Sequence, residues 1–459
     1  MKEQDRASNA ARERPAGDSQ ETIEQELLQK AHDNVAKHRQ GHAQIYLRTP
    51  AGEPLAGVEI QVTQKSQDFL FGNLIFDLLY PESPYRPELF KQRFLELFNL
   101  AIFPFYWTTY ERTPGMPGWH SLMPVLEWCR LNGVTPKGHP LVWPYVAGVP
   151  EWLYDMPQGS VEPLIQARVM SIVKGFEPYI HVWDVTNEAV NHVSWAEATQ
   201  PAFRARYHDT SLWRGIPVAG AFKREIPIPE AADWVEQSFR WAYAANPQAT
   251  LIVNDYNQIV DKGVRQRFYD LVKELHTRGT PVSGLGLQVH PLDHWLWPQE
   301  VWDTLDLYAE LGCPIHITEL HQPAWDHAIE GGWREGMWTQ EAQAEYLEQL
   351  YRQFYGHPAV ASINYWGFSD RHIWVSGGGL IDEEYRPKPV FDALKKLIKG
   401  EWMTPPLTAS TDAEGKVSFR GFFGQYEVVI RQPGQRYTTC QVHLAENQDN
   451  VWRFTIRMG

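Results

Sequence analysis

The sequence predicts an α/β fold, a (β/α)8 TIM barrel, with an accessory β-sandwich built from both flanks of the chain. Between residues 67 and 402, eight short apolar runs alternate with longer amphipathic stretches, the pattern of repeated strand and helix units. Alternation of apolar and polar residues at 43–64 and 416–457 predicts strands in both flanks. No GxGxxG motif follows the first apolar run, which disfavours an open dinucleotide-binding sheet.

The amino-terminal flank divides into a polar start, a helix and two strands. Residues 1–19 are polar and charged with almost no large apolar side chain, so we expect them to be disordered. Apolar residues then recur at helical spacing and predict a helix near 20–39. The runs AQIYLRT and GVEIQVTQ predict strands, so residues 20–66 combine this helix with the first part of the sandwich.

Residues 67–402 are expected to form the barrel. The predicted strands cover residues 69–76, 99–103, 135–143, 181–188, 250–257, 284–290, 314–320 and 361–367. The clearest amphipathic stretches between them cover residues 161–176, 229–245, 263–279 and 340–355. Active sites of such barrels are built at the carboxyl ends of the strands, so polar residues at these ends are candidates for chemistry.

Residues 403–459 return to a β pattern, with four short strands separated by turn-forming residues. This flank resembles the carboxypeptidase-regulatory or transthyretin-like sandwich in its TDAEG turn at 411–415 and its GQY at 424–426. The same resemblance extends to GEPLAGV at 52–58 in the other flank. We therefore expect the two flanks to form one sandwich that the barrel interrupts.

Charge and composition exclude several classes of function. Acidic residues number 56 against 42 basic ones, a net charge of −14, which disfavours nucleic acid and anionic membrane surfaces as partners. The sequence has no apolar run long enough to span a membrane and no signal peptide at its start. We therefore expect either a cytoplasmic protein or a secreted one whose leader was removed. Three scattered cysteines support neither a disulfide framework nor a zinc site, and nothing in the sequence sets an oligomeric state.

Two glutamates stand at the ends of predicted strands. Glu188 ends HVWDVTNE after the fourth strand, and Glu319 follows PIHIT in the seventh. Hydrolysis of a glycosidic bond needs one protonated carboxyl group to expel the leaving oxygen and one ionised carboxylate to attack or to activate water. Taken alone, each glutamate is more simply a helix-start or loop carboxylate.

Seven segments in order resemble glycoside hydrolase family 10, the β-1,4-xylanase family of retaining (β/α)8 enzymes. These segments are GHPLVW at 138–143, WDVTNEA at 183–189, VNDYN at 253–257, GLGLQVH at 284–290, ITEL at 317–320, YWGFSD at 365–370 and LIDEEYRPKPVFDAL at 380–394. The resemblance implies that Glu188 is the acid/base and Glu319 the nucleophile. In retaining enzymes the two carboxyl groups lie about 5–5.5 Å apart.

The same resemblance implies a set of residues that bind the sugar. Asn187 is expected to hold the 2-hydroxyl of the sugar that is cleaved, an interaction that strengthens in the transition state. The other expected substrate-binding residues are His139, Trp143, Gln288, His290, Trp366, Trp374 and Tyr256. For Tyr256 and for the neighbouring Asn254, bracing the site is at least as good an interpretation as substrate contact. No cofactor and no metal are expected, because the mechanism requires no cation.

One segment departs from the family pattern. After its second strand the family carries a Glu-Asn pair and a Met-Lys-Trp run that hold the sugar on the non-reducing side. Here residues 98–111 read FNLAIFPFYWTTYE, with Phe103, Phe105 and Tyr106 in that stretch. We therefore predict a divergent retaining endo-β-1,4-xylanase acting on polysaccharide or oligosaccharide. The alternatives are another β-linked glycan, a short oligosaccharide, or a carbohydrate-binding barrel without catalysis.

Overall fold

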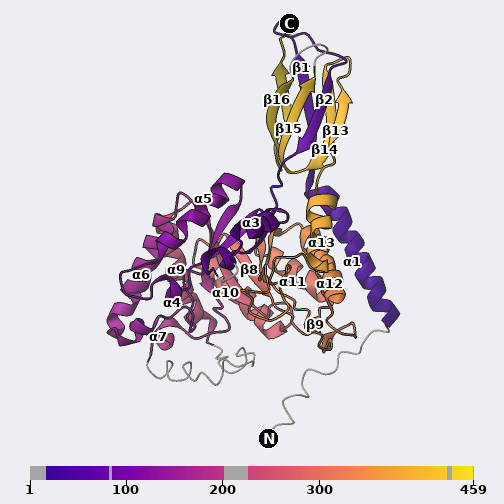
Figure 1. Cartoon of the computed structure of the whole chain (residues 1–459). Coiled ribbons are helices and arrows are strands. Elements are labelled where there is room, and N and C mark those ends of the chain that lie inside the picture. The colour runs from indigo at the N-terminus through magenta and orange to yellow at the C-terminus, as the bar shows by residue number, and fades with distance from the viewer. Residues whose placement is uncertain (1–16, 82–84, 201–225, 432–436, 458–459) are drawn as a thin grey trace.

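The computed structural model describes residues 17–81, 85–200, 226–431 and 437–457 (Figure 1). Eight parallel strands close into a barrel in the order β10-β12-β3-β4-β5-β6-β7-β8. They are β3 (Leu70–Leu74), β4 (Leu100–Pro104), β5 (Thr135–His139), β6 (Val182–Asn187), β7 (Thr250–Tyr256), β8 (Gly284–Val289), β10 (Ile315–Leu320) and β12 (Val360–Tyr365). Six lie within their predicted segments, and β4 and β12 each extend one residue beyond theirs, so the predicted barrel is confirmed.

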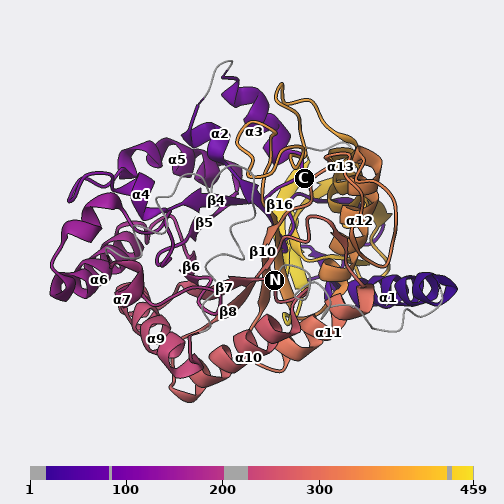
Figure 2. The ribbon, with the colours of Figure 1, turned by 90° about the horizontal axis from the view of Figure 1, so that it is seen from below.

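Helices surround the ring of strands, as the view along the barrel shows (Figure 2). The longer ones are α3 (Pro87–Leu95), α5 (Met123–Asn132), α6 (Gln158–Gly175), α9 (Ile228–Ala245), α10 (Lys262–Thr277), α11 (Pro298–Ala309), α12 (Gln340–Gly356) and α13 (Pro389–Lys395). Short helices are α2 (Phe76–Leu79), α4 (Trp107–Tyr110), α7 (Trp195–Ala198), η1 (Trp119–Ser121), η2 (Glu151–Asp155) and η5 (Lys396–Glu401). A two-stranded sheet of β9 (His294–Trp295) and β11 (Gly331–Gly332) lies in the loops after β8 and β10.

Close packing inside the barrel explains a glycine next to the candidate site. Gly138 of β5 is paired with Trp183 of β6, whose side chain is fully buried. A Cβ atom on Gly138 would lie 2.1 Å from the Trp183 ring, closer than real atoms approach. Glycine at 138 therefore makes room for the indole, and this packing sets the end of β5 where His139 follows.

Strands from both flanks form two further sheets. One has the order β14-β1-β17 and the other β13-β2-β15-β16. Their bounds are β1 (Gln40–Arg48), β2 (Glu59–Gln64), β13 (Leu407–Ser410), β14 (Lys416–Phe422), β15 (Gly424–Arg431), β16 (Thr438–Leu444) and β17 (Val451–Thr455). The two sheets share one buried core, which includes Ile45 of β1, Val62 of β2 and Val428 of β15. Figure 1 shows them at the end of the barrel opposite to α7 and β9.

Helix α1 (Gly17–His38) precedes β1 in the chain but packs on the barrel. Leu27 and Ala31 of α1 form a buried cluster with Trp302 of α11. The guanidinium of Arg39 donates to the carbonyl oxygens of Tyr355 (2.9 Å) and His357 (2.7 Å) at the end of α12. The disorder expected for residues 1–19 falls on residues outside the described part of the chain, except that α1 begins at Gly17.

Candidate active site

Glu188 and Glu319 lie at the carboxyl ends of two barrel strands. Glu188 directly follows β6, and Glu319 is the penultimate residue of β10. Because the strands are parallel, both carboxyl groups belong to the same end of the barrel, where sites of this fold are built. Their residues are largely buried, with 9% and 5% of their surface exposed.

The backbone turns sharply at Glu188. Its φ angle is +62°, in the left-handed region that residues other than glycine rarely adopt. Consecutive side chains of a regular strand point to opposite faces, yet Asn187 Nδ2 donates to Glu188 Oε1 at 3.2 Å. The left-handed residue directly after β6 therefore allows these two neighbours to reach one site. Strain of this kind concentrates at functional sites.

Three amide side chains form the network that connects the carboxyl groups. Asn254 of β7 donates from Nδ2 to Asn187 Oδ1 at 2.7 Å and to Glu319 Oε1 at 2.9 Å. Gln288 of β8 donates from Nε2 to Asn187 Oδ1 at 3.1 Å and to Glu188 Oε1 at 3.2 Å. Residues of β6, β7, β8 and β10 thus converge with Glu188 in one hydrogen-bonded network.

Two further side chains bind the other oxygen of Glu188. The indole Nε1 of Trp143 donates to Glu188 Oε2 at 2.8 Å. His192 Nε2 lies 2.6 Å from the same oxygen. Four nitrogen atoms therefore surround the Glu188 carboxyl group, two at each oxygen.

Glu319 is flanked by two histidines. His290 Nε2 lies 3.3 Å from Glu319 Oε2, and His139 Nε2 lies 3.7 Å from Glu319 Oε1. The other nitrogen of His139, Nδ1, lies 2.8 Å from Asp184 Oδ2, which also pairs with Lys137 Nζ at 2.8 Å. This buried Asp184 fixes the ring of His139 so that its free nitrogen faces Glu319.

The partners of the two carboxyl groups separate their pKa values. Burial raises the pKa of Glu319 to about 8. The negative charge of Glu188 also raises this pKa, and His139 lowers it. Burial acts on Glu188 in the same direction, but His192, Trp143 and Gln288 outweigh it and hold its pKa below the usual range. Burial also lowers the pKa of His290 to about 4, so its ring is neutral at neutral pH. This arrangement favours an ionised Glu188 and a protonated Glu319.

Three predicted aromatic residues lie beside the histidines that contact the two carboxyl groups. The ring centroid of Trp366 lies 5.0 Å from that of His139, and Trp366 is 8% exposed. The ring of Trp374 lies 5.0 Å from that of His290 and is 59% exposed, which leaves it open to a ligand. Tyr256 lies 6.1 Å from the ring of His192. The structure thus gathers all ten predicted site residues at one end of the barrel.

The segment after β4 places rings beside the site. Tyr106 lies 5.8 Å from the rings of both His139 and Trp143. Phe76 lies 6.5 Å from the rings of both Tyr106 and Trp366. An aromatic wall of Phe76, Tyr106 and Trp366 therefore borders the site on the side of β3, β4 and β12.

The sequence analysis missed three charged or titratable residues of this site. His192 follows Glu188 by four residues, and its N–H bonds to the Glu188 carbonyl at 3.0 Å, so a helix-like turn brings the two side chains together. Lys137 and His139 alternate with Gly138 on β5, as residues on one face of a strand do. That alternation was the signal that could have placed Lys137, and with it Asp184, inside the barrel.

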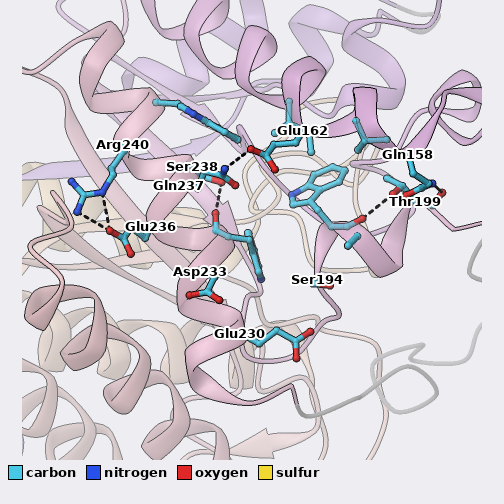
Figure 3. A pocket seen from close by; sticks show the side chains of 16 residues that line it. Gln158, Glu162, Ser194, Thr199, Glu230, Asp233, Glu236, Gln237, Ser238 and Arg240 are labelled. Atoms are coloured by element: carbon cyan, nitrogen blue, oxygen red, sulfur yellow. Dashed lines mark hydrogen bonds and ion pairs between the residues drawn. The ribbon is translucent and has the colours of Figure 1, made fainter.

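A cavity of about 630 Å³ lies outside the barrel between α6, α7 and α9 (Figure 3). Trp195, Trp234 and Trp241 line it together with Glu162 and Gln237, which are hydrogen-bonded to each other at 2.6 Å. None of the ten predicted site residues lines this cavity. The candidate chemistry therefore belongs to the strand ends and not to this cavity.

Within the described part of the chain, no group of three or more histidine, cysteine, aspartate or glutamate side chains is arranged to hold a metal ion. Its helices also include none that is both long and apolar enough to cross a membrane.

Comparison with known proteins identifies the family. Residues 104–397, more than half of the chain, match the sequence profile of glycosyl hydrolase family 10. The chain belongs to glycosyl hydrolase family 10. It is therefore a glycoside hydrolase of the endo-xylanase type, and the predicted family is confirmed.

Two curated relatives of this family 10 chain are xylanases. Endo-1,4-beta-xylanase B of Thermotoga neapolitana is 29% identical over 284 residues, which are 60% of this chain and 72% of the relative. Endo-1,4-beta-xylanase of Geobacillus stearothermophilus is 29% identical over 274 residues, 56% of this chain and 75% of the relative. The structure of xylanase 10B from Thermotoga petrophila RKU-1 in complex with xylobiose matches 73% of this chain and 95% of that chain, with 24% identity and a TM-score of 0.56. This structural likeness supports the same fold.

Proposed function

We propose that this family 10 chain is a retaining endo-β-1,4-xylanase in which Glu319 is the nucleophile and Glu188 the acid/base. The observation that carries the proposal is the hydrogen-bonded path Glu188–Asn187–Asn254–Glu319, which holds two carboxyl groups in one site. A pair of carboxyl groups is the machinery that glycosidic hydrolysis requires.

The reaction proceeds in two displacements. Glu319 attacks the anomeric carbon while Glu188 gives its proton to the glycosidic oxygen, so that the bond to the leaving sugar breaks. Glu188 then takes a proton from water, which attacks the same carbon and releases Glu319. The configuration at the anomeric carbon is inverted twice and is therefore retained.

The amides assist as the charge develops. Asn187 and Asn254 lie between the carboxyl groups. We infer that the anomeric carbon and 2-hydroxyl of the sugar that is cleaved bind beside them. A hydrogen bond from Asn187 to that hydroxyl stabilises the oxocarbenium-like transition state more than the ground state. Gln288 donates to both Asn187 and Glu188 and so keeps the acid/base beside that hydroxyl.

Xylan is the substrate that we propose first, because the two relatives described above are xylanases. The aromatic wall of Phe76, Tyr106 and Trp366 supports a second candidate, a short oligosaccharide or another β-linked glycan. Tyr106 of this wall belongs to residues 98–111, where the family pattern has charged and amide groups, and rings bind sugar faces by stacking without the directed hydrogen bonds that select hydroxyl groups.

Product analysis on xylan, mannan, mixed-linkage β-glucan and xylo-oligosaccharides tests this proposal. We expect xylan to be cleaved to short xylo-oligosaccharides, with kcat/KM on xylan at least about tenfold above that on mannan, since one pocket contact discriminates by about that factor. Glu188→Gln serves as the control, because it keeps the shape of the site and removes the acid. Cleavage of mannan or β-glucan without cleavage of xylan would contradict the proposal that xylan is the substrate. Equal amounts of product from Glu188→Gln and from the unmodified protein would contradict the role of Glu188 as the acid/base.

A further inference from the structure

The four contacts of Glu188 differ in whether they can accept a proton. The indole of Trp143 can only donate. The amides of Asn187 and Gln288 present NH2 groups to Glu188, because Asn187 Oδ1 already accepts from Asn254 and Gln288. An imidazole nitrogen can donate or accept, so His192 alone among these four partners can bind either state of the carboxyl group.

We propose that His192 is the positioning residue that shares the catalytic proton with Glu188, so that the two side chains act as one acid/base pair. This inference rests on the proposed function and deepens it. The 2.6 Å contact joins His192 Nε2 to Glu188 Oε2. His192 is 6% exposed, and its Nδ1 has no hydrogen-bond partner within the described residues, so the ring is free to carry its proton on either nitrogen.

The proton count of the pair follows the two displacements. At rest the pair holds one proton, either on His192 with Glu188 ionised or on Glu188 with His192 neutral and its hydrogen on Nδ1. When the leaving oxygen takes the proton from Glu188, both members are left without it. In the second displacement the proton from the attacking water returns to Glu188 and to the pair. The net charge of the pair therefore changes by one unit in each step.

This pairing explains why the donors around Glu188 favour its ionised form although the acid/base needs a proton. Three of these partners can only donate a hydrogen bond to Glu188. The fourth, His192, holds the proton that Glu188 needs to act as the acid. Transfer across one short hydrogen bond turns the ionised form into the acid without moving either residue. Ionised Glu319 is needed as well, and since its pKa is raised, activity increases as the pH rises through that pKa.

Other titratable groups surround the pair. From the remaining elements these are Tyr106, Tyr145, Tyr256, Asp255, His290 and Glu319. Asp255 matters most, because burial raises its pKa to about 7 and it binds the N–H of Val190 and the amide of Asn191, next to His192. A test must therefore separate His192 from Asp255.

The pH profile of kcat/KM on soluble xylan makes that separation. The alkaline limb reports loss of the last proton from the pair, and removing one of its two proton sites weakens the binding of that proton. We expect His192→Gln to move the alkaline limb to lower pH by about half a unit or more, so that the rate at a fixed pH on that limb falls about threefold. His443→Gln, an exposed change on β16, is the control and should leave the limb unchanged. The proposal would be overturned if the alkaline limb of His192→Gln stayed where it is in the unmodified protein. It would also be overturned if Asp255→Asn moved that limb and His192→Gln did not.

A second measurement needs no turnover. In NMR spectra of the full chain labelled with 15N-histidine, the His192 signals should report a titration whose midpoint falls by at least about one pH unit in Glu188→Gln, since the paired carboxylate is lost. The same midpoint in both proteins would overturn the pair. If the chain cleaves no glycan of the panel, the proposed function fails, and the NMR titration still decides whether His192 and Glu188 share a proton.

Discussion

Glu319→Ala is expected to lower kcat on xylan by a factor on the order of 10⁴ or more, the size of loss seen when a covalent nucleophile is removed. Without the carboxylate at the end of β10, no group remains on that face of the sugar to form the covalent intermediate. Release of reducing ends measures the loss, and the melting temperature checks the fold. The matched control is Glu310→Ala, because Glu310 is exposed at the end of α11.

The variant also reveals the face of attack. With dinitrophenyl β-xylobioside and azide, Glu319→Ala should form the α-glycosyl azide, because azide occupies the space that the carboxylate leaves. Substantial xylan cleavage by a folded Glu319→Ala protein would contradict the role of the residue. Formation of the β-azide would contradict the face assigned to it.

Glu188→Ala is expected to give a loss that depends on the leaving group. On xylan the rate should fall by about 10²–10⁴, the contribution of general acid catalysis, because the sugar alkoxide cannot leave without a proton. The first displacement on dinitrophenyl β-xylobioside needs no acid and should remain fast. A burst of dinitrophenol followed by slow turnover is the expected signature, since hydrolysis of the intermediate still needs the base.

Azide should accelerate that slow second phase and give the β-glycosyl azide. Equal losses on xylan and on the dinitrophenyl substrate would contradict the acid/base role. Trp143→Phe is a useful companion, because it removes one donor to Glu188 but keeps the carboxyl group, and it should lose much less activity than Glu188→Ala.

The barrel was predictable from the sequence because buried parallel strands are short apolar runs and the helices between them are amphipathic. The candidate carboxylates Glu188 and Glu319 could be found for a related reason, since both end such runs. The roles of Asn187, Gln288 and the aromatic residues came from resemblance to a family, and the structure adds the contacts that connect them.

His192 could not be predicted, because its contact with Glu188 depends on the left-handed φ angle at Glu188 and on the turn that follows. No periodicity in the sequence encodes that turn. The packing of α1 on α11 and α12 also escaped prediction, since a surface helix shows which face is apolar but not which neighbour covers it.

Trapping of the glycosyl-enzyme intermediate tests the central claim most directly. The full chain is incubated with dinitrophenyl 2-deoxy-2-fluoro-β-xylobioside, digested, and analysed by mass spectrometry of its peptides. We predict one added fluoroxylobiosyl group per chain, attached to Glu319 in the peptide that contains PIHITEL. A label on another residue, or no label together with an inverted product, would contradict a retaining mechanism with Glu319 as its nucleophile.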